Sequence, residues 1–140
     1  MFAPQFTLFE LQSRQNVSLS DFRGMPVMLT FWVSWCPDCQ RDMPNKVQFY
    51  QSLDKNTLAF LTVNVTGREH SPESGPQFVY DHQLPFPVLI DQGRELYDAF
   101  GCTGVPTTII LDKNHEIAYQ FGDKASFYDI LQALSSVLNQ

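Results

Sequence analysis

Residues 27–39 of the chain read VMLTFWVSWCPDC, an apolar run of strand formers that ends in two cysteines separated by two residues. Its first part, residues 27–33, is typical of a strand that is buried on both faces. Pro37 suits the first position of a helix, where its missing backbone N–H costs nothing, so we predict a helix from about Pro37 to Leu53. The stretch therefore predicts a central strand that passes into a helix at the cysteine pair.

The rest of the chain predicts an α/β domain around this unit. A second apolar strand, residues 57–65, follows the helix, and this order implies parallel pairing. We expect further strands at residues 6–9, 17–19, 88–90, 107–111 and 117–121, a turn at 12–16, and further helices at 76–82, 95–100 and 127–138. Because no repeat, linker or low-complexity segment interrupts this order, residues 1–140 are expected to form a single domain.

The composition argues against several classes of protein. Apolar residues make up 44% of the chain and charged residues only 17%, which favours a packed core over disorder. The formal net charge is −6 with no cluster of Lys and Arg, so nucleic acid is not expected as a partner. The longest apolar run is far too short to span a bilayer. The three cysteines are an odd number, which favours a chemical role over a disulfide scaffold.

The spacing of Cys36 and Cys39 suits thiol–disulfide exchange. Cys36 is expected to be exposed at the start of the helix, where unpaired N–H groups and the helix dipole favour a thiolate. A thiolate is the attacking species in disulfide exchange. Cys39 is expected one turn further in, within reach of Cys36, so that it can resolve a mixed disulfide.

Other interpretations of the cysteine pair remain open from the residues alone. The pair is also compatible with half of a zinc site, which needs two more ligands. Cys102 and three histidines (His70, His82 and His115) are the other soft candidates, and none forms a second paired motif. Two structural cysteines are the third interpretation. We expect Cys102 to be a packing residue, the histidines to be solvated, and no metal or cofactor to be bound.

The motifs of the chain resemble those of the thioredoxin superfamily, and most closely those of its TlpA/ResA branch of thiol–disulfide oxidoreductases. They occur in the order of that branch along nearly the whole chain: residues 3–8 (APQFTL), 19–24 (LSDFRG), 31–39 (FWVSWCPDC), Pro44, 63–66 (VNVT), 86–88 (FPV) and 105–108 (VPTT). The resemblance implies a thioredoxin-like fold, with a central mixed sheet flanked by helices and an N-terminal β-hairpin extension. It also implies a cis peptide bond between Val105 and Pro106.

The resemblance implies roles for the matching residues. Cys36 would be the nucleophile and Cys39 the resolving thiol. The substrate-binding positions would be Trp35, Pro37, Val105 and Pro106. A cis-proline turn beside the disulfide would present the Val105 backbone to an extended substrate segment.

The proton acceptor is where the chain departs from thioredoxin itself. Many thioredoxins carry a buried Asp six residues before the first cysteine, and here Thr30 occupies that position. In the TlpA/ResA branch an acid follows the neighbouring strand in the pattern Val-Asn-x-Thr-x-x-Glu, which residues 63–69 reproduce. The resemblance therefore implies that Glu69 takes the proton from Cys39, and the alternative is a solvated loop glutamate.

The implied activity is the reduction of protein disulfides. The expected partners are protein substrates and a thiol–disulfide electron donor, and the expected state is a monomer without membrane insertion by this segment. In the branch this reduction takes place outside the bacterial cytoplasm, for example on cytochrome c precursors that await haem. Because the first residues show no basic region or cleavage motif, either a targeting segment has been trimmed or the protein is cytoplasmic.

Two other functions are weighed against this one. Residues 6–8 and 19–22 also resemble peroxiredoxin-like thiol peroxidases. Such a peroxidase would have a Thr one turn before the reactive cysteine, where Trp32 and Val33 stand here. The other alternative is a non-enzymatic metal-binding module, for example a copper chaperone.

Overall fold

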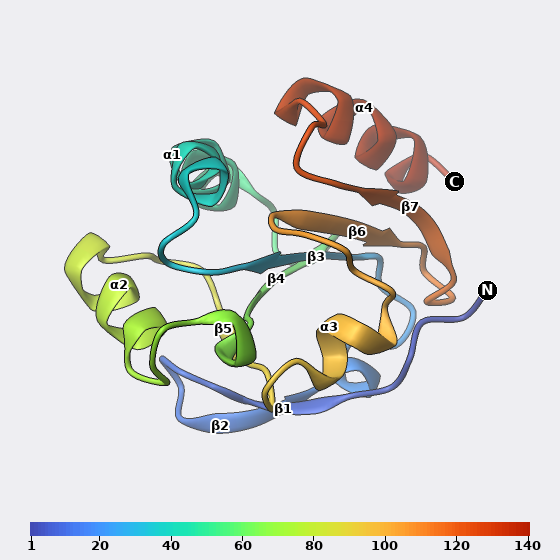
Figure 1. Cartoon of the computed structure of the whole chain (residues 1–140). Helices are drawn as coiled ribbons and strands as arrows, with labels where there is room; N and C mark the ends of the chain where they lie inside the picture. Colours follow the sequence, from blue (N-terminus) through green and yellow to red (C-terminus); the bar gives the residue numbers. More distant parts are fainter.

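The structure is a computed structural model that describes residues 1–140, and its strands form one seven-stranded mixed sheet. The strands are β1 (Thr7–Glu10), β2 (Gln15–Ser18), β3 (Val27–Trp32), β4 (Ala59–Asn64), β5 (Val88–Ile90), β6 (Thr107–Leu111) and β7 (Ile117–Phe121). Their order across the sheet is β2-β1-β5-β4-β3-β6-β7. β3 pairs in parallel with β4 and antiparallel with β6, so it lies inside the sheet as expected (Figure 1).

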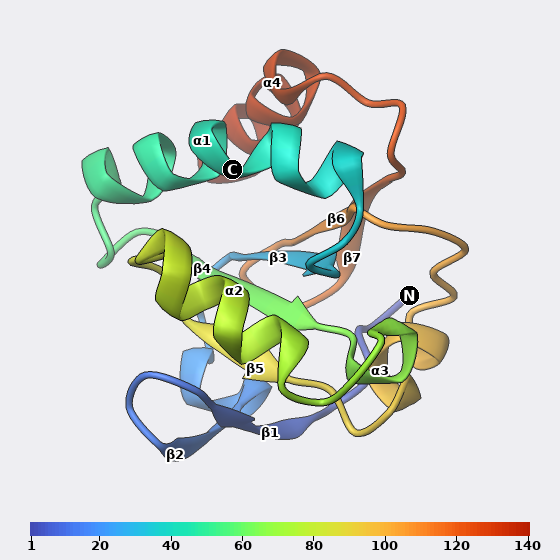
Figure 2. The ribbon, with the colours of Figure 1, turned by 60° about the vertical axis from the view of Figure 1, so that its left-hand side comes forward.

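Helices cover both faces of this sheet. They are α1 (Pro37–Ser52), α2 (Ser74–His82), α3 (Glu95–Ala99) and α4 (Phe127–Leu138), with short 3₁₀ turns at Leu19–Phe22 and Thr66–Arg68. α1 and α4 lie together on one face, where the rings of Phe49 and Phe127 meet with centroids 6.0 Å apart (Figures 1 and 2). None of the helices combines the length and the apolar composition needed to cross a membrane.

Neighbouring residues of β3 bury their side chains on opposite faces, as the pleat of a strand requires. The ring of Trp32 packs against Phe78 of α2, with centroids 5.6 Å apart. Phe31 packs against Tyr97 of α3 and against Phe100, with centroids 6.2 and 5.7 Å apart. All six residues of β3 are buried, which confirms the prediction of a strand covered on both sides.

The N-terminal hairpin is confirmed, but its turn is shorter than predicted. β2 begins at Gln15 instead of residue 17, because Arg14 adopts a left-handed conformation (φ 59°) that closes the turn early. The Glu10 carboxylate accepts hydrogen bonds from the turn amides of Gln12 (2.9 Å) and Ser13 (2.8 Å). It also accepts one from Val88 N of β5 (3.0 Å), so a single buried carboxylate joins the hairpin to the sheet.

His115 is not solvated, and here the sequence-based expectation was wrong. It lies between β6 and β7 and is only 8% exposed. Its Nε2 lies 2.9 Å from the carbonyl oxygen of Phe22 and 3.0 Å from that of Met25. The segment before β3 therefore covers a histidine whose own neighbours in the sequence are polar.

We predict that replacing Glu10 with Gln lowers the free energy of unfolding by about 1–3 kcal/mol at pH 7. Burial raises the pKa of the Glu10 carboxyl, but its hydrogen bonds from the backbone of Gln12, Val88 and Ser13 outweigh this and hold the pKa below its usual range. A carboxyl with a lowered folded-state pKa contributes stability that is present above its unfolded-state pKa and is lost as the pH falls through the folded-state value.

Urea titrations of both proteins at several pH values test this prediction. The difference in the free energy of unfolding between wild type and Glu10→Gln should become smaller as the pH falls. Glu73→Gln is the matched control, because Glu73 is exposed and should change stability little at any pH. A Glu10→Gln protein as stable as the control would show that the carboxylate does not hold the hairpin.

Candidate active site

The two cysteines stand at the N-terminus of α1, as the sequence predicts. Cys36 caps the helix, Pro37 follows at its first turn, and the Cys36 Sγ accepts a hydrogen bond from the backbone N of Cys39 at 3.4 Å. Both are free thiols in this structure. Cys36 is 7% exposed and Cys39 only 1%. Cys36 is thus less exposed than expected, because the loop before β6 covers it, but it is the more accessible of the two.

That loop brings the Val105–Pro106 bond to the cysteine pair. The bond is cis, as the resemblance implied. The Cys36 thiol lies 3.6 Å from the carbonyl oxygen of Val105 and donates to it. A backbone carbonyl 69 residues away in the sequence therefore lies against the thiol.

The environment of Cys39 disfavours its thiolate. Burial raises the pKa of the Cys39 thiol above its ordinary value, and the neighbouring Cys36 and Asp42 raise it further. Asp42 lies one turn along α1 and forms an ion pair with Lys46, at 2.9 Å between Oδ2 and Nζ. Sequence reasoning missed both charged residues. The available signal was their helical spacing from Cys39, at i+3 and i+7.

Glu69 contacts the segment that leads into Cys36. Its carboxylate accepts hydrogen bonds from Ser34 N (2.7 Å), Ser34 Oγ (2.6 Å) and Asn64 Nδ2 (2.7 Å). The structure shows no hydrogen bond between Glu69 and either cysteine. Glu69 therefore ties the end of β4 to the residues before α1, and is not a freely solvated loop residue.

The other residues singled out from the sequence lie around the pair. Trp35 is 44% exposed, and its indole N–H donates to the carbonyl oxygen of Arg68 at 2.8 Å. Thr30 is buried and its hydroxyl lies 3.3 Å from that of Thr108, so no carboxylate occupies the position where many thioredoxins have one. Cys102 is buried, and burial raises the pKa of its thiol to about 12.

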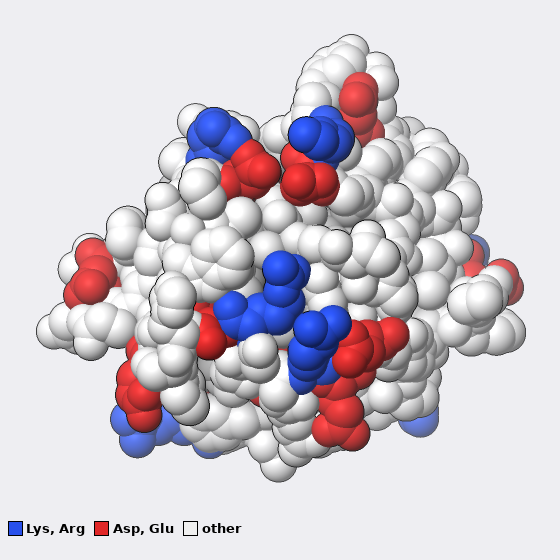
Figure 3. Space-filling view, viewed as in Figure 1, with Lys and Arg blue, Asp and Glu red and all other residues white.

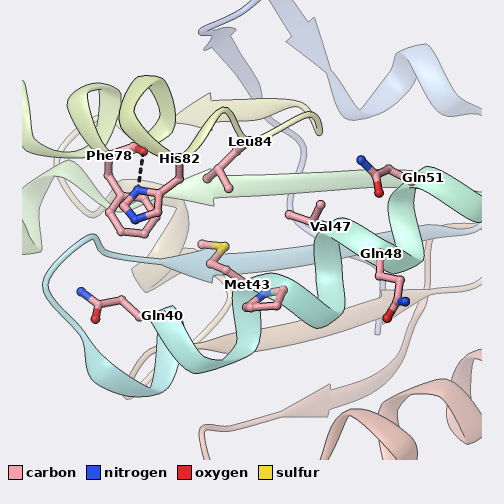
Figure 4. A pocket seen from close by; sticks show the side chains of 9 residues that line it. Gln40, Met43, Val47, Gln48, Gln51, Phe78, His82 and Leu84 are labelled. Carbon is pink, nitrogen blue, oxygen red and sulfur yellow. Dashed lines mark hydrogen bonds between the residues drawn. The ribbon is translucent and has the colours of Figure 1, made fainter.

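A separate groove runs between α1 and the segment that includes α2. It has a volume of about 760 Å³, and Figure 4 shows Met43 and Val47 from α1 facing Phe78, His82 and Leu84 across it. Neither cysteine lines this groove. The groove and the cysteine pair are therefore separate features of the surface.

We predict that iodoacetamide modifies Cys36 at least about tenfold faster than Cys102 in the reduced protein at neutral pH. The two residues are almost equally exposed, at 7% and 8%, so accessibility alone predicts equal rates. The Cys36 Sγ accepts the backbone N–H of Cys39 at the start of α1, whereas burial raises the pKa of the Cys102 thiol to about 12 and so disfavours the reactive thiolate there. Mass spectrometry of peptides from timed digests gives both rates. Equal labelling would mean that the helix start does not activate Cys36.

Comparisons with known proteins agree with this geometry. A family model described as the AhpC/TSA family matches residues 2–120. The thiol-disulfide oxidoreductase ResA of Geobacillus thermodenitrificans (strain NG80-2) is 34% identical over 135 residues, which are 96% of this chain and 75% of that protein. The sporulation thiol-disulfide oxidoreductase A of Bacillus subtilis (strain 168) is 27% identical over 114 residues, 81% of this chain and 68% of that one.

Solved structures share the fold over most of the chain. The pneumococcal exposed lipoprotein thioredoxin Etrx1 from Streptococcus pneumoniae strain TIGR4 superposes with a TM-score of 0.84 at 26% identity, covering 95% of this chain and 99% of that one. StoA from Bacillus subtilis superposes with a TM-score of 0.81 at 23% identity, covering 94% of this chain and 96% of that one. The chain therefore belongs to the AhpC/TSA family, and it is a ResA-like thiol–disulfide oxidoreductase of the thioredoxin superfamily.

Proposed function

We propose that the protein reduces disulfide bonds of other proteins, with Cys36 as the attacking thiol and Cys39 as the resolving thiol. The observation that carries this assignment is the position of Cys36 as the cap of α1, with Cys39 more deeply buried behind it. A thiolate at the helix start attacks readily, while a buried thiol with a raised pKa reacts with a disulfide that is already held beside it.

The reaction has two exchange steps. The Cys36 thiolate attacks one sulfur of the substrate disulfide, a mixed disulfide forms and the first substrate sulfur leaves as a thiolate. The Cys39 thiolate then attacks Cys36 Sγ, the bond between Cys36 and the substrate breaks, and the second substrate sulfur leaves. The protein now holds the Cys36–Cys39 disulfide, and a thiol–disulfide electron donor returns it to the dithiol.

The substrate is proposed to lie along the loop before β6. The Val105 backbone borders Cys36, and an extended substrate segment can pair with a backbone in this position. Pro106, Pro37 and the exposed ring of Trp35 would complete the contact surface. Basic and acidic side chains lie next to one another on the face in Figure 3, so no strong charge of one sign selects the substrate there.

We further propose that the protein works as a monomer outside the cytoplasm. The structural relative from Streptococcus pneumoniae is described as an exposed lipoprotein, and the resemblance to the TlpA/ResA branch points to the same side of the membrane. The peroxidase and metal-binding alternatives are not favoured, because the curated relatives are named as thiol–disulfide oxidoreductases.

Trapping distinguishes the two cysteines. We predict that a Cys39→Ser protein accumulates mixed disulfides with a protein substrate that contains disulfide bonds, such as insulin, because nothing resolves the bond at Cys36. A Cys36→Ser protein should trap almost nothing, and both variants should lose catalytic insulin reduction. Non-reducing electrophoresis and mass spectrometry give the readout. Trapping by Cys36→Ser alone would reverse the assignment.

Glu69 is proposed to handle the proton of Cys39, and its replacement tests this role. We predict that Glu69→Gln slows dithiol oxidation at least about tenfold and shifts its pH profile, because an amide cannot take up a proton. The fold should remain intact, since the side-chain oxygen of the introduced Gln can still accept a hydrogen bond from Ser34. The control is again the exposed Glu73→Gln. If Glu69→Gln exchanges disulfides at the wild-type rate across roughly pH 6 to 9, the span of thiol titration, then Glu69 only anchors Ser34.

A further inference from the structure

Lys46 is buried in the middle of α1, where it is only 1% exposed. Its Nζ forms an ion pair with Oδ2 of Asp42 at 2.9 Å, and Nζ has no further polar partner. On its other side Nζ lies 5.3 Å from the ring centroid of Phe127 in α4. Lysine is almost never fully buried unless it is paired, and here a single carboxylate and an aromatic face compensate its charge.

Lys46 and Asp42 lie on the same side of α1 as Cys39. The spacing from Cys39 to Asp42 to Lys46 is i, i+3, i+7, which places the three side chains along one face of a helix. Helical side chains also tilt toward the N-terminus, so Lys46 extends back toward Asp42 and Cys39. Both the thiol and the ammonium are shielded from water, and charges act on one another strongly in such surroundings.

The charges of these groups influence one another. Burial raises the pKa of Cys39, and the Asp42 carboxylate adds to this effect. Burial lowers the pKa of Lys46, while Asp42 and a thiolate at Cys39 both oppose that change. Because the interaction between two charges is mutual, an ammonium at Lys46 favours a thiolate at Cys39.

The other charged groups nearby are more exposed. Asp38, Arg41 and Asp42 of α1 and Asp123 from the loop between β7 and α4 line a shallow cavity of about 270 Å³. Arg41 and Asp38 form an ion pair with each other, and their side chains are 74% and 40% exposed. The basic group of this cavity, Arg41, is paired at the surface, so Lys46 is the cation that is shielded from water on this face of α1.

We propose that Lys46 is a positioning residue for the resolving step, and that its buried ammonium, held beside Asp42, supplies the positive charge that compensates the thiolate forming at Cys39. This proposal rests on the role of Cys39 as the resolving thiol. In that step Cys39 loses its proton and attacks Cys36 Sγ, the Cys36–Cys39 bond forms, and the bond to the substrate sulfur breaks. The substrate sulfur leaves as a thiolate and takes up a proton, while Lys46 keeps its own.

The resolving step can be observed by itself with a small aromatic disulfide, dithiobis(nitrobenzoate). Attack by Cys36 on the reagent releases one nitrothiobenzoate and leaves a second one bound to Cys36. Attack by Cys39 then releases the second at a rate that does not depend on reagent concentration. Stopped-flow absorbance of the full chain separates the two releases over a range of pH.

We expect Lys46→Met to slow the second release about tenfold at pH 7, which corresponds to one pKa unit, and to move its pH profile upward. The first release should be unchanged. Lys55→Met is the control, because the Lys55 Nζ also lies over an aromatic ring, 4.3 Å from the centroid of Tyr50, but its side chain is exposed. A folded Lys46→Met protein with the second release of wild type would overturn the proposal.

The double variant Asp42→Asn/Lys46→Met separates charge from packing. With both charges removed, the second release should return toward the wild-type rate, and a rate as slow as that of Lys46→Met would again overturn the proposal. If Lys46→Met does not fold, Asp42→Asn is compared with the double variant. The protein that keeps Lys46 should resolve faster, and equal rates would reject the role of Lys46. A wild-type protein without any second release would instead contradict the role of Cys39.

Discussion

Strand β3 has hydrogen-bonded neighbours on both edges and helices on both faces, and the position of the active site depends on this complete burial. Phe31 and Trp32, at its end, are locked between α3 and α2. The chain leaves the sheet directly after Trp32, and Cys36 becomes the cap of α1. Since interior side chains are close-packed, the end of β3 has little freedom to move. The thiol of Cys36 is therefore held at a fixed position relative to the loop before β6.

Buried or half-buried carboxylates hold the connections around this rigid centre. Glu10 closes the N-terminal hairpin and binds β5, and Glu69 binds Ser34 and Asn64. Asp91 accepts hydrogen bonds from the backbone of Leu96 and Tyr97 at the start of α3. Each carboxylate satisfies backbone or amide donors that would otherwise be buried without partners, which is costly. The same residue type thus serves as structural anchor in three connecting segments.

The active site differs in that one of its buried charges, the ammonium of Lys46, has a single polar partner. This ammonium carries three N–H donors and is paired with Asp42 alone, and the thiol of Cys39 lies on the same face of α1. Such a group is costly in the resting protein, because its solvation is lost and only partly replaced. In the role proposed for Lys46, its charge is compensated most fully when the Cys39 thiolate forms during the resolving step.

Local patterns in the sequence were sufficient for the elements and for the cysteine pair. The apolar run at residues 27–33 predicted the central strand, and Pro37 after the first cysteine predicted the start of the helix. Neighbouring residues also predicted the strands at Val88–Ile90, Thr107–Leu111 and Ile117–Phe121. These signals suffice because strand and helix periodicity, and the preference of proline for a helix start, act over a few residues.

The burial of individual polar residues was decided only by the tertiary structure. Lys46, Glu10 and His115 are polar, and residue type alone predicts that each of them lies at the surface. Each is buried because a segment distant in the sequence covers it or binds it: Phe127 lies over Lys46, Val88 binds Glu10, and the carbonyls of Phe22 and Met25 meet His115. The sequence by itself determined which residues form the redox pair, whereas the burial of Lys46 on the same face of α1 as Cys39 was set by the packing of α1 against α4.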